Sequence, residues 1–153
     1  MPKMERINSQ ILAALQEDAR MTNRALAERI GLSPSSTLER TRELERSGMI
    51  AGYHANVDLR AMGRGIEALV FVRVSPKSRA LLDTVIEQIW ALPETVAISL
   101  LSGDIDLIVH VAVSDTDHLR DMVIDRIGSI DGVLDERTSL LFEHRRKPVI
   151  EPL

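Results

Sequence analysis

Cysteine is absent from this sequence, aromatic residues are scarce, and no apolar run is long. Without cysteine the chain forms neither disulfide bonds nor thiolate metal sites, which fits a reducing cytoplasm. Aromatic residues make up only 3 % of the 153 residues, so the cores must be built from Leu, Ile, Val, Ala and Met. No apolar run approaches the roughly 20 residues that cross a membrane, and the first residues lack the apolar centre of a signal peptide. We expect a soluble, cytoplasmic protein with no membrane partner.

Residue patterns typical of metal or catalytic sites are also missing. None of the four histidines stands at metal-ligand spacing from another, so a zinc or iron site is not predicted. The sequence has no glycine-rich phosphate loop and no nucleophile elbow. We expect no catalytic residues, no metal and no cofactor. Four aspartates in the second half are interpreted as a solvated helix face: Asp115, Asp117, Asp121 and Asp125.

The net charge of −4 is unevenly divided along the chain. Residues 1–48 carry eight Lys or Arg and seven Asp or Glu, a net charge of +1, whereas residues 49–153 carry eleven and sixteen, a net charge of −5. The acidity therefore lies in the second half. A net charge of +1 is a weak electrostatic basis for binding nucleic acid. Any DNA binding must depend on where the charges lie and on several copies acting together.

The stretch from Gly31 to Ile50, GLSPSSTLERTRELERSGMI, has the features of the second helix of a helix-turn-helix. Ser33 is a favourable N-cap residue and Pro34 suits the first helical position. Upstream, residues 23–30 form a short apolar-faced helix, and a three-residue turn beginning with Gly31 joins the two. The second helix of such a motif enters the DNA major groove. The alternative interpretation is a surface helical hairpin without a ligand.

Within this second helix, Thr37, Thr41 and Leu44 share one face and are predicted to point inward. Each threonine hydroxyl is expected to bond the carbonyl four residues back. The candidate DNA-contacting residues are Ser33, Ser35, Ser36, Glu39, Arg40 and Arg42. Arg40 is the best single candidate for reading a base. The alternative is that its guanidinium pairs with a nearby glutamate of the same helix, Glu39, Glu43 or Glu45.

The remaining pattern predicts an α+β protein with two domains. Residues 5–18 form an amphipathic helix, residues 48–58 a short strand pair or wing, and residues 59–65, with two glycines, a linker. The domains predicted are 1–58 for DNA binding and 66–143 for a second core, followed by an extended tail, 144–153. The second domain is predicted from strands at 66–75, 96–102, 105–113 and 133–143 and helices at 77–92 and 115–130. This βαββαβ order is ferredoxin-like and leaves one sheet face for a partner subunit.

Two segments resemble one protein family. GLSPSSTLERTRELERSGMIAGY looks like the DNA-binding segment of the Lrp/AsnC family of prokaryotic transcription regulators, and SGDIDLIVHV, Ser102 to Val111, looks like a signature of its effector-binding (RAM) domain. The resemblance runs from about Met4 to about Glu143. It implies a winged helix-turn-helix domain joined to a βαββαβ domain. It also implies double-stranded DNA as a partner and homodimers that assemble into tetramers or octamers, with affinity and assembly modulated by a small amino acid.

The resemblance also implies an effector site. Its predicted residues are Ser102, Gly103, Asp104 and Asp106 in one hairpin, with Thr138, Ser139 and Leu140 of the last strand as a neighbouring wall. A carboxylate suits an α-ammonium group, and backbone N–H groups suit an α-carboxylate. Taken without the family, the Gly-Asp pair is an ordinary tight turn. The family often has an aromatic residue where Ile105 stands.

Two alternative functions stay open. Sirohaem decarboxylases resemble this family in both domains and use His and Arg residues of the second domain to hold a tetrapyrrole. The candidates for these residues here are His110 and Arg137. The capped helix-turn-helix favours a regulator instead, and His110 is most simply a sheet residue. The other alternative is an architectural DNA-binding protein without an effector.

Overall fold

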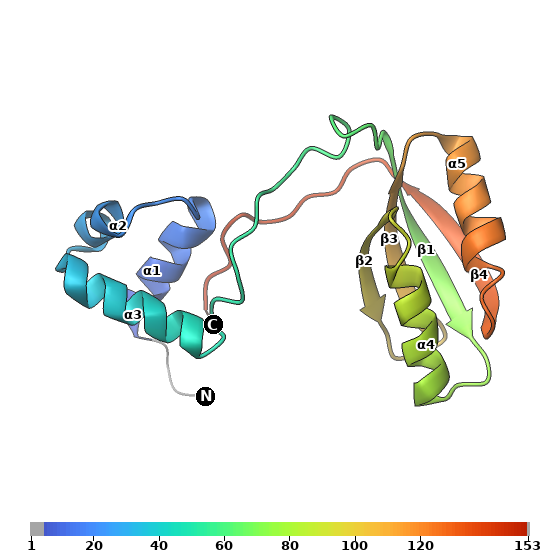
Figure 1. The fold of residues 1–153 in the computed structure, drawn as a ribbon, viewed down its shortest axis with the longest axis horizontal. Coiled ribbons are helices and arrows are strands. Elements are labelled where there is room, and N and C mark those ends of the chain that lie inside the picture. The colour runs from blue at the N-terminus through green and yellow to red at the C-terminus, as the bar shows by residue number, and fades with distance from the viewer. Residues whose placement is uncertain (1–4, 153) are drawn as a thin grey trace. The chain divides into compact units, whose positions relative to one another are not determined.

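The computed structural model describes residues 5–152, which form two compact units (Figure 1). One unit comprises the described residues up to Asn56 together with those from Arg145 onward, and the other is Val57–His144. The second unit carries eight Lys or Arg and fifteen Asp or Glu, a net charge of −7, so the rest of the sequence is at +3. The chain thus keeps its acidity in the unit that lacks the helix-turn-helix.

The first unit contains three helices, α1 (Arg6–Glu17), α2 (Asn23–Ile30) and α3 (Pro34–Arg46) (Figure 1). All three predicted helices are confirmed. Thr22 caps α2 by accepting a hydrogen bond from Ala25 N. Gly31 ends that helix with a left-handed φ of 74°, a conformation that glycine adopts without a steric penalty. The buried core is small, and its members are Ile11, Ala14, Leu26 and Leu44.

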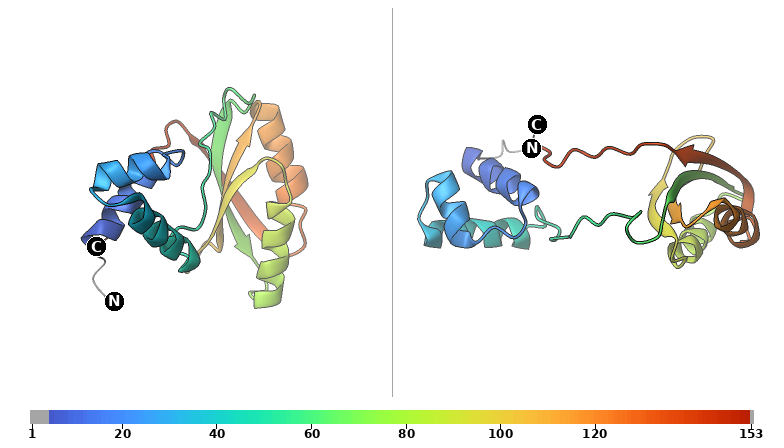
Figure 2. Two further views of the ribbon diagram at one scale, coloured as in Figure 1. Left: turned by 60° about the vertical axis from the view of Figure 1, so that its left-hand side comes forward. Right: turned by 90° about the horizontal axis from the view of Figure 1, so that it is seen from above.

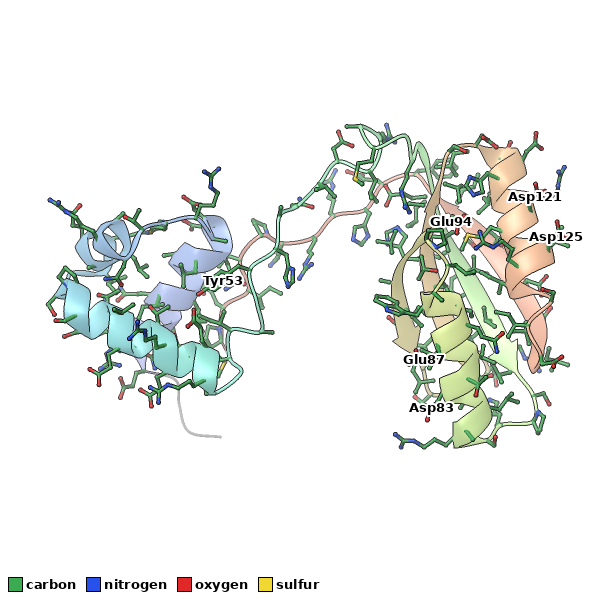
Figure 3. The ribbon with its side chains drawn as sticks, viewed as in Figure 1. Tyr53, Asp83, Glu87, Glu94, Asp121 and Asp125 are labelled. Carbon is green, nitrogen blue, oxygen red and sulfur yellow. The ribbon has the colours of Figure 1, made fainter. Side chains whose placement is uncertain are left out.

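The strand pair expected at residues 48–58 is not formed, because residues 51–57 have neither helix nor strand. An isolated two-stranded hairpin is marginal in water, and Gly52 and Asn56 are poor strand formers. One side chain ties the segment down instead. Tyr53, labelled in Figure 3, donates a hydrogen bond of 2.9 Å from its hydroxyl to Glu45 Oε1 in the last turn of α3.

The chain returns to the first unit at its C-terminal tail. Residues 143–152 contain no helix or strand. The side-chain amide of Gln16 in α1 donates to the carbonyl of Ile150 at 3.1 Å and accepts from its N–H at 3.0 Å. Gln16 therefore holds the tail through the main chain of one residue.

The second unit is a four-stranded antiparallel sheet with two helical segments, which confirms the βαββαβ prediction (Figure 1). Its strands lie in the order β2-β3-β1-β4. The elements are β1 (Ile66–Val74), α4 (Arg79–Trp90), β2 (Thr95–Leu100), β3 (Leu107–Val113), α5 (Thr116–Asp121) with the π-helical η1 (Met122–Ile127), and β4 (Val133–Leu141). Before β1, residues 59–63 form turns, and Arg64 N donates to Leu59 O at 2.8 Å.

Both helical segments cover the same face of the sheet, as Figure 2 shows. On this face Val70 of β1 stands opposite Val109 of β3, and both are fully buried. The alternate residues point to the other face, where Leu69 stands opposite His110 and neither is fully buried. The sheet therefore has one packed face and one face that no helix of this unit covers.

The helix predicted over 115–130 is not a single α-helix. Asp115 is exposed, as predicted, and is also the N-cap, since its carboxylate accepts from His118 N at 2.8 Å. After Asp121 the helix continues as η1, which is π-helical. Its end is marked by a hydrogen bond from Gly128 N to Val123 O, five residues earlier in the chain. A π-turn holds one residue more than an α-turn. The other aspartates of the predicted solvated face, Asp117, Asp121 and Asp125, are exposed. Asp121 and Asp125 are labelled in Figure 3.

Candidate DNA-binding and ligand sites

Three serine side chains meet at the start of α3. Ser33 Oγ accepts from Ser36 N at 3.2 Å, which confirms Ser33 as the N-cap. Its hydroxyl also lies 2.9 Å from Ser36 Oγ and 3.1 Å from Ser35 Oγ. Asn23 Nδ2 of α2 donates to Pro34 O at 2.8 Å, which fixes this end of α3 to the preceding helix. The result is an exposed helix N-terminus carrying three hydroxyl groups, a common source of contacts to DNA phosphates.

The two sides of α3 differ sharply in burial. Thr37 is fully buried and Leu44 is 5 % exposed. The two predicted back-bonds are present: Thr37 Oγ1 donates to Ser33 O at 3.0 Å, and Thr41 Oγ1 donates to Thr37 O at 2.9 Å. The opposite side is exposed and carries Ser35, Glu39, Arg42 and Arg46. This exposed side has the shape and polarity that a major-groove helix requires.

Arg40 differs from the other predicted DNA-contacting residues. Its guanidinium turns toward α1, where Nη1 donates to Glu5 Oε2 at 2.7 Å and to Asn8 Oδ1 at 3.1 Å. The expected alternative, a pair with a glutamate of its own helix, is not what the structure has. The partner is 35 residues away in the sequence. Arg42, by contrast, lies in the exposed side of α3.

The hairpin predicted to bind an effector separates into an exposed tip and a buried base. Ser102, Gly103 and Asp104 are exposed, and Gly103 has a φ of 124°, a region that favours glycine. Asp106 is 5 % exposed, and its carboxylate accepts from Val74 N at 2.9 Å and pairs with Lys77 Nζ at 2.9 Å. Asp104 is therefore the carboxylate of this hairpin that faces solvent.

The bonds of Asp106 shift its acidity. Burial alone would raise the pKa of the Asp106 carboxyl, but hydrogen bonds from Val74 N–H and Lys77 outweigh burial and hold the pKa below its usual range. Lys77 Nζ also donates to Gly103 O at 3.2 Å. Asp106 and Lys77 thus hold the hairpin against the end of β1.

The predicted wall residues do not meet the hairpin within one chain. Thr138, Ser139 and Leu140 lie on β4, which pairs with β1, whereas the hairpin joins β2 to β3. Strand β1 separates the two sets. Thr138 and Ser139 moreover point to opposite faces, since residues alternate along a strand. A site that uses both sets would need a second copy of the chain.

His110 and Arg137, the residues of the enzyme alternative, both lie on the uncovered face of the sheet. His110 Nε2 is 2.9 Å from Glu67 Oε2, and its ring centroid is 5.5 Å from that of His144. Arg137 Nε is 3.6 Å from Asp135 Oδ2. These side chains have partners within the sheet, which confirms the prediction that His110 is a sheet residue.

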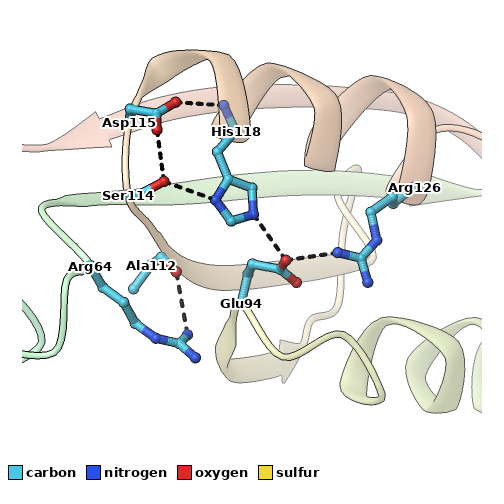
Figure 4. A network of polar contacts seen from close by, with 7 residues as sticks. All are labelled: Arg64, Glu94, Ala112, Ser114, Asp115, His118 and Arg126. Atoms are coloured by element: carbon cyan, nitrogen blue, oxygen red, sulfur yellow. Dashed lines mark hydrogen bonds and ion pairs between the residues drawn. The ribbon is translucent and has the colours of Figure 1, made fainter.

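A polar cluster that the sequence did not reveal joins three elements of the second unit (Figure 4). Glu94, between α4 and β2, has its Oε1 2.7 Å from Arg126 Nη1 and 3.0 Å from His118 Nε2. His118 Nδ1 lies 3.1 Å from Ser114 Oγ, which donates to Asp115. Burial favours a higher pKa for Glu94, but the bonds from His118 and Arg126, with a backbone bond, lower the pKa overall. The partners lie 24 and 32 residues from Glu94, so no sequence spacing could have indicated the cluster.

Two features are absent from the described part of the chain. Between residues 5 and 152, no group of three or more His, Asp or Glu side chains stands where it could hold a metal ion. In the same residues, no helix combines the length and apolarity needed to cross a membrane.

Together these features define a DNA-binding regulator: a capped helix-turn-helix in one unit and a separate α+β unit. Two families of domains match the sequence, "Winged helix-turn-helix DNA-binding" over residues 4–51 and "Lrp/AsnC ligand binding domain" over residues 67–148. The chain belongs to the Lrp/AsnC family of transcriptional regulators.

Named relatives agree with this assignment. The HTH-type transcriptional regulator AldR of Mycolicibacterium smegmatis is 36 % identical over 143 residues, covering 94 % of this chain and 84 % of that protein. The leucine-responsive regulatory protein of Salmonella typhimurium is 36 % identical over 144 residues, covering 92 % and 85 %. A Neisseria meningitidis transcriptional regulator solved as a complex with L-Met has a TM-score of 0.87 and 27 % identity, covering 95 % and 94 %. These relatives are regulators, and the chain is a transcriptional regulator rather than an enzyme.

Proposed function

We propose that this regulator binds specific DNA sequences through the exposed side of α3, and that a small amino acid modulates its assembly and DNA affinity. The observation that carries the DNA part is the arrangement of α3: a serine-capped N-terminus with Ser35, Glu39 and Arg42 exposed on the side opposite the buried Thr37. Ser33, Ser36 and Arg40, the other predicted contact residues, border this side. A guanidinium on such a helix can form a bidentate bond to guanine.

The effector part is supported by the exposed hairpin tip and by the nature of the relatives. Asp104 offers a solvent-facing carboxylate for an α-ammonium group, and the turn around Gly103 exposes backbone groups beside it. The Neisseria regulator of similar fold was solved with L-Met. Because Asp106 is already bonded to Val74 and Lys77, its role in our proposal is to hold the hairpin rather than to bind the ligand.

Assembly follows from the uncovered sheet face. Leu69, Phe71 and Ile108 lie there and are only partly buried within one chain. Apolar side chains on an open sheet face favour association with another copy. We propose a homodimer formed through this face, and further assembly that brings the hairpin of one copy near Thr138–Leu140 of another. Light scattering that gives a monomer mass at micromolar concentration would contradict this.

One set of titrations tests the DNA part. A duplex would be selected from a random library with the parent protein, and affinities measured by fluorescence anisotropy. Arg42→Ala should lose roughly 1–3 kcal/mol of specific binding, the usual value of a bidentate base contact, with an unchanged melting temperature. Arg79→Ala, which removes an exposed arginine from the second unit, is the matched control and should bind like the parent. If no duplex is selected, the proposal fails.

The same titrations in the presence of individual amino acids test the effector part. We expect one of them to change the parent's DNA affinity by about 1–3 kcal/mol, a typical coupling energy. Asp104→Ala should lose this response and keep its DNA affinity without ligand, while Asp117→Ala, an exposed aspartate far along the chain, should respond like the parent. A normal response in Asp104→Ala would place the ligand elsewhere.

A further inference from the structure

The role of Arg40 follows from the kinds of contact that hold α3 in place. Leu44 is the only residue of α3 in the buried apolar core of this unit. The hydroxyl of the buried Thr37 donates a hydrogen bond to the carbonyl of Ser33, and the hydroxyl of the half-buried Thr41 donates to the carbonyl of Thr37. These threonines therefore bond their own helix and give α3 no directional link to its neighbours.

Two polar contacts supply that link. At its N-terminus, α3 is joined to α2 by the bond from Asn23 to Pro34. One turn before Leu44, Arg40 joins it to α1 through Glu5 and Asn8, both at the beginning of that helix. The Arg40 side chain is 35 % exposed and lies on the flank of α3 rather than in the middle of its exposed side. A charge-assisted bond to two acceptors fixes direction as well as distance.

We infer that Arg40 is a positioning residue that sets the orientation of α3 against α1, through Glu5 and Asn8, and does not itself read DNA. This inference rests on the proposed DNA binding by α3. Specific contacts need the helix to enter the groove at one angle, whereas sequence-independent contacts to phosphates tolerate a less fixed helix. Loss of the Arg40 link should therefore reduce binding to the selected duplex more than binding to a scrambled one.

A charge exchange separates this role from direct contact with DNA. Arg40→Glu and Glu5→Arg each place like charges together, while the double variant restores an opposite pair. Asn8 suits either arrangement because its amide both accepts and donates. A positioning role is restored by the exchange, but an arginine that contacts DNA cannot be replaced by a glutamate at the same position.

The experiment compares the parent, both single variants and the double variant by anisotropy titration with the selected and scrambled duplexes at several salt concentrations. We expect each single reversal to lower affinity for the selected duplex about tenfold, because a displaced α3 loses base contacts and one good bidentate contact is worth about that much. The double variant should recover to within about threefold of the parent. Its slope of affinity against salt concentration should equal the parent's.

The outcomes are distinct. If the double variant stays as weak as Arg40→Glu, with a salt slope reduced by about one as for a lost phosphate contact, Arg40 contacts DNA and the inference is wrong. If single reversals bind like the parent, the link positions nothing and the inference is also wrong. Failure of the parent to select any duplex would instead refute the proposed function. The control is the exchange Arg79→Asp with Asp83→Arg, an exposed pair in the second unit, which should change no affinity.

Discussion

The two units of this regulator are stabilised in different ways. Among the described residues, the sheet unit has a buried cluster of fifteen apolar residues between its sheet and its helical segments. The buried apolar cluster of the helix-turn-helix unit has four, and the fully buried Thr37 adds to it. Because apolar burial is the dominant favourable term in folding, the helix-turn-helix unit depends more on caps and on polar links between helices. The weaker packing is therefore in the DNA-binding unit, where the orientation of α3 against the other helices is more easily changed.

The largest difference between the two units is expected from a cavity in the small core of the helix-turn-helix unit. Ile11 is fully buried in α1, and Ile11→Ala should cost about 2–5 kcal/mol, as large-to-small core changes do. That is enough to unfold a weakly packed unit. Specific DNA binding should be lost while the sheet unit stays folded.

Trp90 makes the two units separately observable. It is the single tryptophan of the chain and lies in α4 of the sheet unit, so its fluorescence reports unfolding there, and far-ultraviolet circular dichroism reports all helices. In Ile11→Ala the dichroism transition should move to lower temperature and the fluorescence transition should not. Ile127→Ala, a matched change in the larger core, should move the fluorescence transition. A common shift of both signals in Ile11→Ala would show that the units unfold together.

A smaller effect is expected from the polar cluster of the sheet unit. Glu94→Gln removes the charge that bonds His118 and Arg126, and should cost about 1 kcal/mol, because both partners are partly exposed and solvent weakens the pairs. The Trp90 fluorescence transition measures this cost at neutral pH. An unchanged transition would mean that the cluster contributes nothing to stability.

Acid should remove the same contribution. The pKa of Glu94 is lowered in the folded protein, so its stabilisation is present above the ordinary glutamate range near about 4.3 and is lost as pH falls through the folded pKa. The difference between parent and Glu94→Gln should therefore shrink as the pH falls below that range. Asp106, whose pKa is also lowered, keeps its own contribution in both proteins and does not alter the comparison.

Features that depend on neighbouring residues were predictable from the sequence. The cap by Ser33 and the back-bonds of Thr37 and Thr41 join residues three or four apart, and all were expected. The strands and helices of the sheet unit were found from apolar periodicity, because burial on one face imposes it. Local chemistry thus determined the elements and the helix-turn-helix.

Features that join distant residues were not predictable. The Arg40 link spans 35 residues and the Arg126 bond to Glu94 spans 32, and both depend on the packing of separate elements. For residues 48–58 the prediction was a strand pair or a wing, and the strands are not formed. Alternating apolar residues indicate a strand but do not supply the neighbouring strand that it needs. The π-turn of η1 was not predicted, because one extra residue in a single turn changes the spacing of apolar residues too little to be recognised in the sequence.

The smallest expected effect concerns Tyr53, which ties residues after α3 back to that helix. Burial, then the hydrogen bond and charge of Glu45, raise the pKa of Tyr53 to about 12. Tyr53 is the single tyrosine, so absorbance of the phenolate near 295 nm follows this group alone. Because the neutral phenol donates to Glu45, its contribution is present below the ordinary tyrosine pKa of about 10 and is lost as pH rises through the folded value.

Glu45→Gln sharpens this test. The variant keeps an acceptor for the phenol but removes the negative charge, so the pKa of Tyr53 should fall part of the way toward about 10, the value of a free tyrosine. Burial, the largest cause of the raised pKa, remains in the variant. Helical dichroism recorded during both titrations ensures that the phenol is titrated in the folded protein. Glu39→Gln, an exposed glutamate of the same helix, is the control and should leave the pKa of Tyr53 unchanged. Equal titration of the parent and Glu45→Gln would mean that Glu45 does not hold Tyr53 against the helix that we propose reads DNA.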